Sequence, residues 1–75
     1  SFLLKKHFSG LTPYDLSLIG YLKGGVSTRE IGLILNIAPE SVKKSKHRLR
    51  KKLNMPSDMD FREFFSQLEH RETLD

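Results

Sequence analysis

Basic side chains are concentrated in one short stretch of this 75-residue chain. Residues 39–53 hold seven of the thirteen lysines and arginines and a single acid, Glu40, which gives a local charge of +6. Residues 57–75 hold six acids against two arginines, a local charge of −4. A compact cluster of cations on a small domain is suited to binding a polyanion, and the phosphate backbone of a nucleic acid is the foremost example.

Wound on a helix at about 100° per residue, residues 42–53 divide into an apolar line and a basic line. The apolar line consists of Val42, Leu49 and Leu53. The basic line opposite consists of Lys44, His47 and Lys51, flanked by Lys43, Arg48 and Arg50. Each pair of like charges three or four residues apart on a helix destabilises it by roughly a few tenths of a kcal/mol. Packing alone gives no reason to crowd them, whereas a bound phosphate backbone would offset the repulsion.

The elements that must position these residues are expected to be four helices, because no window alternates with the period of two typical of a strand. The first helix begins at Thr12-Pro13, a capping residue followed by proline, and ends near Lys23, before Gly24-Gly25. The second begins at the capping box Ser27–Glu30 and ends near Leu35-Asn36. The predicted fold is therefore all-α.

The third helix is predicted from Pro39 through Leu53, and the fourth begins at Ser57, Asp58 or Asp60. The fourth carries one apolar stripe at i, i+3, i+4 and i+7: Phe61, Phe64, Phe65 and Leu68. Residues 1–10 are a lead-in segment or a short extra helix, and residues 70–75 a frayed tail. In such an extra helix, apolar side chains would cover the first helix: Phe2, Leu3, Leu4 and Phe8.

The segment between Ile31 and Ser45 is typical of a helix-turn-helix. Gly32 leaves room where two helices cross closely, and Asn36 accepts the left-handed conformation of a tight turn. Apolar residues around the turn fix the angle between the helices. Ser45 is the imperfect position, because an apolar side chain would pack better there.

The chain resembles the LuxR/GerE-type helix-turn-helix domain over about residues 11–68, and we take residues 11–69 as that domain. The residues that carry the resemblance are Leu11-Thr12-Pro13, Gly25 to Gly32, Leu35-Asn36-Ile37, Ser41-Val42-Lys43 and Lys51-Lys52-Leu53. The resemblance implies a four-helix domain of a bacterial transcription regulator, acting in the cytoplasm downstream of a sensor or receiver domain. It also implies that the third helix enters the major groove of duplex DNA and that the fourth supplies a homodimer contact.

Carried over by position, the resemblance implies base contacts by Lys43, Lys44 and His47. It implies phosphate contacts by Ser27, Thr28 and Ser41. Arg48 and Lys51 suit the phosphates that flank the groove; the alternative for either is an ion pair with an acid on the body of the domain.

Other residues of this domain have packing or pairing roles in our interpretation. The stripe Phe61, Phe64, Phe65 and Leu68 is first a core stripe, and a ring left exposed would be a dimer contact. The Lys46 stem packs while its amine reaches solvent. Lys52 pairs with Glu30 or Asp15. Tyr14 and Tyr21 pack.

The same sequence features are compatible with two other functions. The helix-turn-helix could be a scaffold whose basic face binds an acidic protein, or the chain could bind promoters in the manner of sigma-factor region four. The sequence predicts no enzyme, because it holds no nucleophile–base pair, no framed pair of acids and no glycine-rich phosphate loop. It also predicts no cofactor, no metal site and no membrane contact, since it lacks cysteine and any apolar run of roughly 18 residues.

Overall fold

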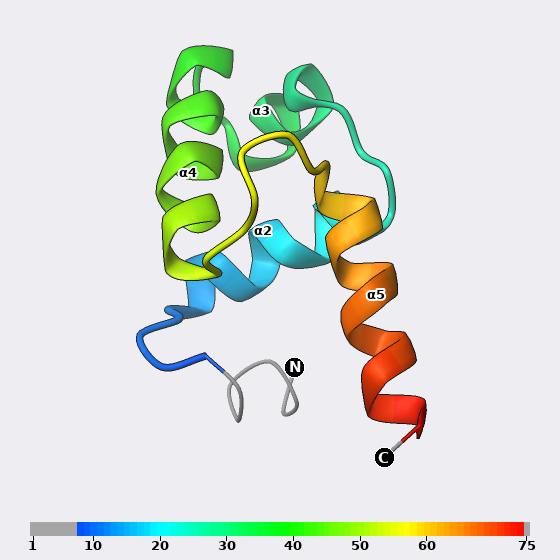
Figure 1. Cartoon of the computed structure of the whole chain (residues 1–75). Coiled ribbons are helices and arrows are strands. Elements are labelled where there is room, and N and C mark those ends of the chain that lie inside the picture. Colours follow the sequence, from blue (N-terminus) through cyan, green and yellow to red (C-terminus); the bar gives the residue numbers. More distant parts are fainter. Residues whose placement is uncertain (1–7, 75) are drawn as a thin grey trace.

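The computed structural model describes residues 8–74, and the side chains of residues 8–70. These residues form four helices in the order α2 (Pro13–Lys23), α3 (Thr28–Leu35), α4 (Pro39–Lys52) and α5 (Phe61–Leu74), with no strand among them (Figure 1). The predicted all-α class is therefore confirmed. The extra helix considered for residues 1–10 falls mostly outside the described residues.

Capping boxes begin the first two helices, as the sequence predicts. The amide of Asp15 donates to Thr12 Oγ1 at 3.1 Å, and the amide of Thr12 donates to Asp15 Oδ2 at 2.8 Å. Ser27 and Glu30 exchange the same two bonds at 3.1 and 3.3 Å. These reciprocal bonds satisfy backbone N–H groups that a helix start would otherwise leave unpaired.

The ends of the later helices differ in part from expectation. The amide of Glu63 donates to Asp60 Oδ1 at 2.8 Å, so Asp60 is the capping residue among the three candidates for the start of α5. Helix α4 ends at Lys52, one residue earlier than predicted. Helix α5 continues to Leu74, whereas the sequence predicts a frayed tail from residue 70.

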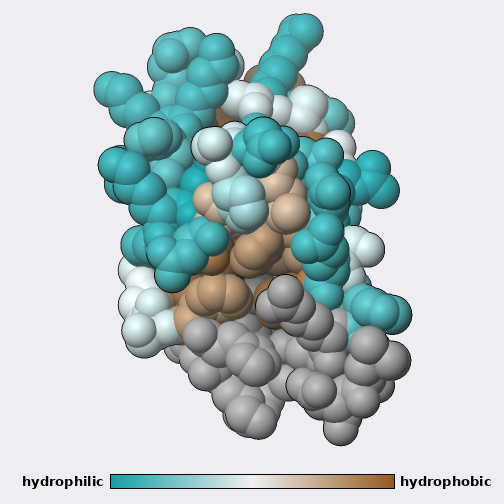
Figure 2. Space-filling model, in the orientation of Figure 1, coloured by the Kyte–Doolittle hydropathy of each residue, from teal (hydrophilic) through white to brown (hydrophobic). Residues whose placement is uncertain are grey.

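The core lies where α3 packs on α4 and α2 packs on α5. Its most deeply buried side chains are Leu18, Ile19, Ile31, Val42, Leu49 and Leu53. Lys23 Nζ lies 2.6 Å from Glu69 Oε1, an ion pair that joins α2 to α5 at the surface. Figure 2 shows apolar side chains in the middle of one face, with hydrophilic ones on either side. Among residues 8–74, no helix combines the length and the apolar character needed to cross a bilayer.

Candidate nucleic-acid interface

Helix α4 has one buried line and one exposed line. Val42 and Leu49 are 0% exposed, and Leu53, directly after the helix, is 1% exposed. The opposite side carries the exposed residues Lys43, Lys44, His47, Arg48 and Lys51. The helical winding predicted from the sequence is thereby confirmed, and the basic line is free to meet a partner.

The turn between α3 and α4 depends on backbone contact. Asn36 has φ 57° and ψ 46°, the left-handed conformation predicted for it. The amide of Ile37 donates to the carbonyl of Gly32 at 2.9 Å. A β-carbon on Gly32 would lie 2.8 Å from the carbonyl oxygen of Ile37, closer than real side chains approach. The need for glycine at position 32 is therefore confirmed, but its cause is the backbone of the turn; the nearest side-chain atom of α4, Val42 Cγ2, would lie at an ordinary 3.8 Å.

The hydroxyl groups predicted to bind phosphate lie at the starts of α3 and α4. Ser27 Oγ caps α3 by accepting a backbone N–H at 3.1 Å, and Thr28 Oγ1 accepts from Lys46 Nζ at 3.1 Å. Ser41 is exposed in the first turn of α4, where Ala38 provides no side-chain cap. Ser27 and Thr28 act as acceptors in these contacts, so each can still donate its own hydroxyl hydrogen to an outside oxygen.

Most of the outward cations of α4 have no acidic partner within residues 8–70. Lys43 Nζ lies 3.3 Å from Glu40 Oε1, an exposed pair within the helix. Among residues 8–70, none of the ion pairs involves Lys44, Arg48 or Lys51. An open hollow of about 380 Å³ on this face is lined by Glu40, Lys43, Lys44, His47 and Arg48. The face therefore presents positive charge that the described part of the chain leaves largely unneutralised.

The basic side chains on the flank of α4 that faces α5 contact other parts of the domain. The guanidinium of Arg50 lies 4.5 Å from the centre of the Phe61 ring and donates through Nη1 to the carbonyl of Met59 at 2.7 Å. Lys46 Nζ lies 5.8 Å from the same ring centre. The sequence predicts that Arg50 flanks the basic line, but its side chain is held against Phe61 instead. Lys46 is half-buried, as predicted for its stem, and its amine donates to Thr28 Oγ1 at 3.1 Å beside the same ring.

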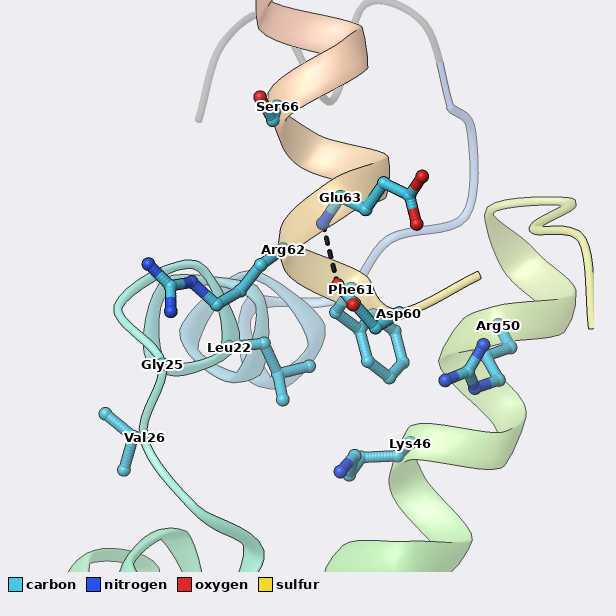
Figure 3. A pocket seen from close by; sticks show the side chains of 10 residues that line it. All are labelled: Leu22, Gly25, Val26, Lys46, Arg50, Asp60, Phe61, Arg62, Glu63 and Ser66. Carbon is cyan, nitrogen blue, oxygen red and sulfur yellow. Dashed lines mark hydrogen bonds between the residues drawn. The ribbon is translucent and has the colours of Figure 1, made fainter. Parts of the chain in front are cut away.

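A cavity of about 650 Å³ separates these two cations from Arg62 (Figure 3). Arg62 lies against Gly25, with Nη1 3.4 Å from the position of a β-carbon there. Partial burial, together with repulsion from Arg50 and Lys43, lowers the pKa of Lys46. Positive charge on this flank is therefore unfavourable for folding. Contacts of the two cations with the Phe61 ring and with neutral oxygens offset this cost.

The flank of α4 that faces α2 ends in a partly buried ion pair. Lys52 Nζ lies 2.5 Å from Asp15 Oδ2, so the structure selects Asp15 over Glu30 as the partner of Lys52. Burial raises the pKa of Asp15, but hydrogen bonds from Lys52 and Thr12 outweigh burial and lower it overall. This pair anchors the end of α4 to the start of α2.

The expectation that an apolar side chain would suit position 45 better than serine was wrong. Ser45 is buried at 5% exposure, and its Oγ lies 2.8 Å from the hydroxyl of Tyr14. Arg48 Nη2 donates to the same Oγ at 3.3 Å. A hydroxyl is therefore useful at this position, because it links α2 to the basic face. Tyr14, predicted as a packing residue, is 40% exposed and makes this polar contact.

The apolar stripe of α5 is divided between the core and the surface. Phe61 and Phe65 are buried, at 5% and 3% exposure, which removes them as dimer contacts in this arrangement. Phe64 and Leu68 are half-buried. Both line a hollow of about 320 Å³ together with Phe8, whose ring centre lies 6.3 Å from that of Phe64. Phe64 and Leu68 remain the candidates for a dimer contact.

Comparison of the sequence with known protein families gives a match. Residues 9–64 match the family described as bacterial regulatory proteins, luxR family. The matched range contains α2, α3, α4 and the start of α5. No curated protein sequence and no solved structure matches the chain significantly.

Proposed function

The chain belongs to the luxR family of bacterial regulatory proteins, which are DNA-binding regulators of transcription, and we propose that it binds duplex DNA sequence-specifically with α4 in the major groove. The observation that carries this proposal is the division of α4. Its apolar line is fully buried, while Lys44, His47 and Lys51 are exposed. A helix of this kind fits the major groove and has side chains available for base edges.

In this proposal the side chains of α4 and of the start of α3 make two kinds of contact with the duplex. Base edges are contacted by Lys43, Lys44 and His47. Backbone phosphates are contacted by Ser27, Thr28, Ser41, Arg48 and Lys51. The phosphate contacts fix the position of the domain on the duplex, and the base contacts choose the sequence.

We also propose that two copies bind one site through α5, with Phe64 and Leu68 in the contact. These two side chains are half-buried and line a hollow that a second copy would fill. A twofold arrangement would require a palindromic target with half-sites about one helical turn apart. The proposed place of action is the bacterial cytoplasm, where duplex DNA is found, under the control of a sensor or receiver domain.

The decisive experiment is a titration of the chain with random-sequence duplex at low salt, followed by amide signals. We expect the signals of residues 43–51 to shift. The logarithm of the affinity should fall against the logarithm of salt with a slope of about −0.9 per phosphate, for roughly four to six phosphates per copy. If millimolar duplex leaves these signals unmoved while an acidic protein shifts them, the domain is a protein-interaction module instead.

Selection of bound duplexes from a random pool then tests sequence specificity. A palindromic consensus would support both the specific readout and the dimer. Recovery of sequences without any consensus would contradict specific readout while leaving duplex binding intact.

A further inference from the structure

Three polar side chains form a hydrogen-bonded network beside the exposed basic residues of α4. The hydroxyl of Tyr14 in α2 lies 2.8 Å from Ser45 Oγ in α4, and Arg48 Nη2 donates to that same Oγ at 3.3 Å. Ser45 is buried, whereas Tyr14 and Arg48 are exposed. These contacts thus connect α2, through the buried Ser45 hydroxyl, to the exposed guanidinium of Arg48 on α4.

Arg48 keeps most of its binding capacity in this arrangement. Its contact with Ser45 uses one N–H of a guanidinium that has five. Ser45 is neutral, and among residues 8–70 no carboxylate forms an ion pair with Arg48. The remaining donors and the whole charge are therefore available to an anion outside the chain. A guanidinium matches the paired oxygens of a phosphate.

The position of Ser45 Oγ is supported from two sides. The Tyr14 hydroxyl lies 2.8 Å from it on the side of α2, and Arg48 Nη2 donates to it at 3.3 Å on the side of the surface. The contact with Tyr14 favours the side-chain rotamer of Ser45 that keeps Oγ within reach of Arg48. Because Tyr14 and Ser45 are 31 residues apart, this support depends on the fold that brings α2 within reach of α4 and not on α4 alone.

We propose that Tyr14, acting through Ser45, is a positioning residue that holds the Arg48 guanidinium in place for a backbone phosphate of duplex DNA. This inference rests on the proposed function, because it requires a duplex beside α4. A guanidinium that is held before binding loses less side-chain freedom when the phosphate arrives. The hydroxyl of Tyr14 therefore strengthens binding to duplexes of any sequence without reading a base.

The test measures the affinity of the chain for random-sequence duplex in parent and substituted forms. Tyr14→Phe removes only the hydroxyl and is expected to weaken binding about three- to ten-fold, the cost of ordering one long side chain at an interface. In an Arg48→Ala background, Tyr14→Phe should weaken binding no further. In a Lys51→Ala background, the matched control, Tyr14→Phe should keep its full effect.

A merely structural role for Tyr14 would weaken binding equally in both backgrounds, and that result would overturn the inference, as would no effect of Tyr14→Phe in the parent chain. If Tyr14→Phe lowers the thermal stability of the chain, Ser45→Ala provides a second route and must show the same dependence on Arg48. Failure of the parent chain to bind duplex would overturn the proposed function as well. Binding by the parent without the coupling to Arg48 would overturn this inference alone.

Discussion

Gly32 and Ile37 are in contact through their backbones: a β-carbon on Gly32 would lie 2.8 Å from the carbonyl oxygen of Ile37. That carbonyl belongs to the turn in which the amide of Ile37 also bonds Gly32, so it cannot move alone. We expect Gly32→Ala to destabilise the domain by about 1–3 kcal/mol through overpacking, although alanine favours helices. Denaturant unfolding measures this change.

Gly20 provides the matched control for Gly32. It also lies within a helix, but a β-carbon there would meet nothing within 4 Å. Gly20→Ala is expected to raise the free energy of unfolding by about 0.5–1 kcal/mol, because alanine loses less backbone freedom on folding. Equal effects of the two substitutions would show that the close contact at Gly32 does not constrain the fold.

Lys44 and Lys51 should differ in what they contribute to DNA binding. Both are exposed on α4, but the proposal gives Lys44 a base edge and Lys51 a phosphate. Lys44→Ala is expected to weaken binding to a selected site by at most about 1–3 kcal/mol and to relax base preference at one position. Lys51→Ala should weaken all sequences alike and reduce the salt slope by about one. Matched and scrambled duplexes separate these outcomes, and identical behaviour of the two variants on both would refute the assignment.

The stability of the domain should fall in acid, partly through Asp15. Its carboxyl has a folded-state pKa below the ordinary value of 3.8, despite burial, because Lys52 and Thr12 bond the charged form. A lowered pKa contributes stability that is present above pH 3.8 and is lost as the pH falls through the folded-state pKa. Lys52→Met removes one partner and should cost about 1 kcal/mol at neutral pH.

Because other carboxyls titrate in the same range, the informative quantity is the difference between parent and Lys52→Met. Unfolding free energies of both chains are measured from neutral pH down into acid. The difference should shrink as Asp15 becomes protonated. A difference that stays constant with pH would mean that Lys52 does not act through Asp15.

Two neighbouring parts of α5 should respond differently to substitution. Phe65 is 3% exposed, and Phe65→Ala is expected to cost about 3–5 kcal/mol of stability. Leu68 is half-buried, and Leu68→Gln should leave the chain folded but weaken the cooperative binding of two copies to a palindromic duplex. Thermal unfolding and the stoichiometry of binding measure the two effects. Unchanged cooperativity in folded Leu68→Gln would argue against Leu68 as a dimer contact.

Features decided by a few neighbouring residues could be predicted from the sequence. Both capping boxes, the left-handed Asn36 and the need for glycine at position 32 involve residues at most five positions apart. The buried line of α4 followed from the helical period. In such cases the bonding partner is fixed by the local geometry of the chain, so residue type and spacing are sufficient.

Contacts between distant parts of the chain could not be predicted in the same way. Tyr14 reaches Ser45 across 31 residues, and Lys46 reaches Thr28 across 18. Long side chains have many rotamers, and the packing of the helices selects among them. A serine at the apolar position 45 was the one signal in the sequence, since a buried hydroxyl requires a partner. The spacing of the apolar residues in α5 likewise could not indicate which of its aromatic side chains would be buried in the core.

The separation of the two lines of α4 has a consequence for evolution. The residues that hold the helix in place, Val42 and Leu49, share no position with those that would choose a DNA sequence, Lys44 and His47. Exchanging the outer pair therefore leaves the interior intact, and a descendant of this chain can acquire a new target without first being restabilised. Retargeting by design can follow the same route.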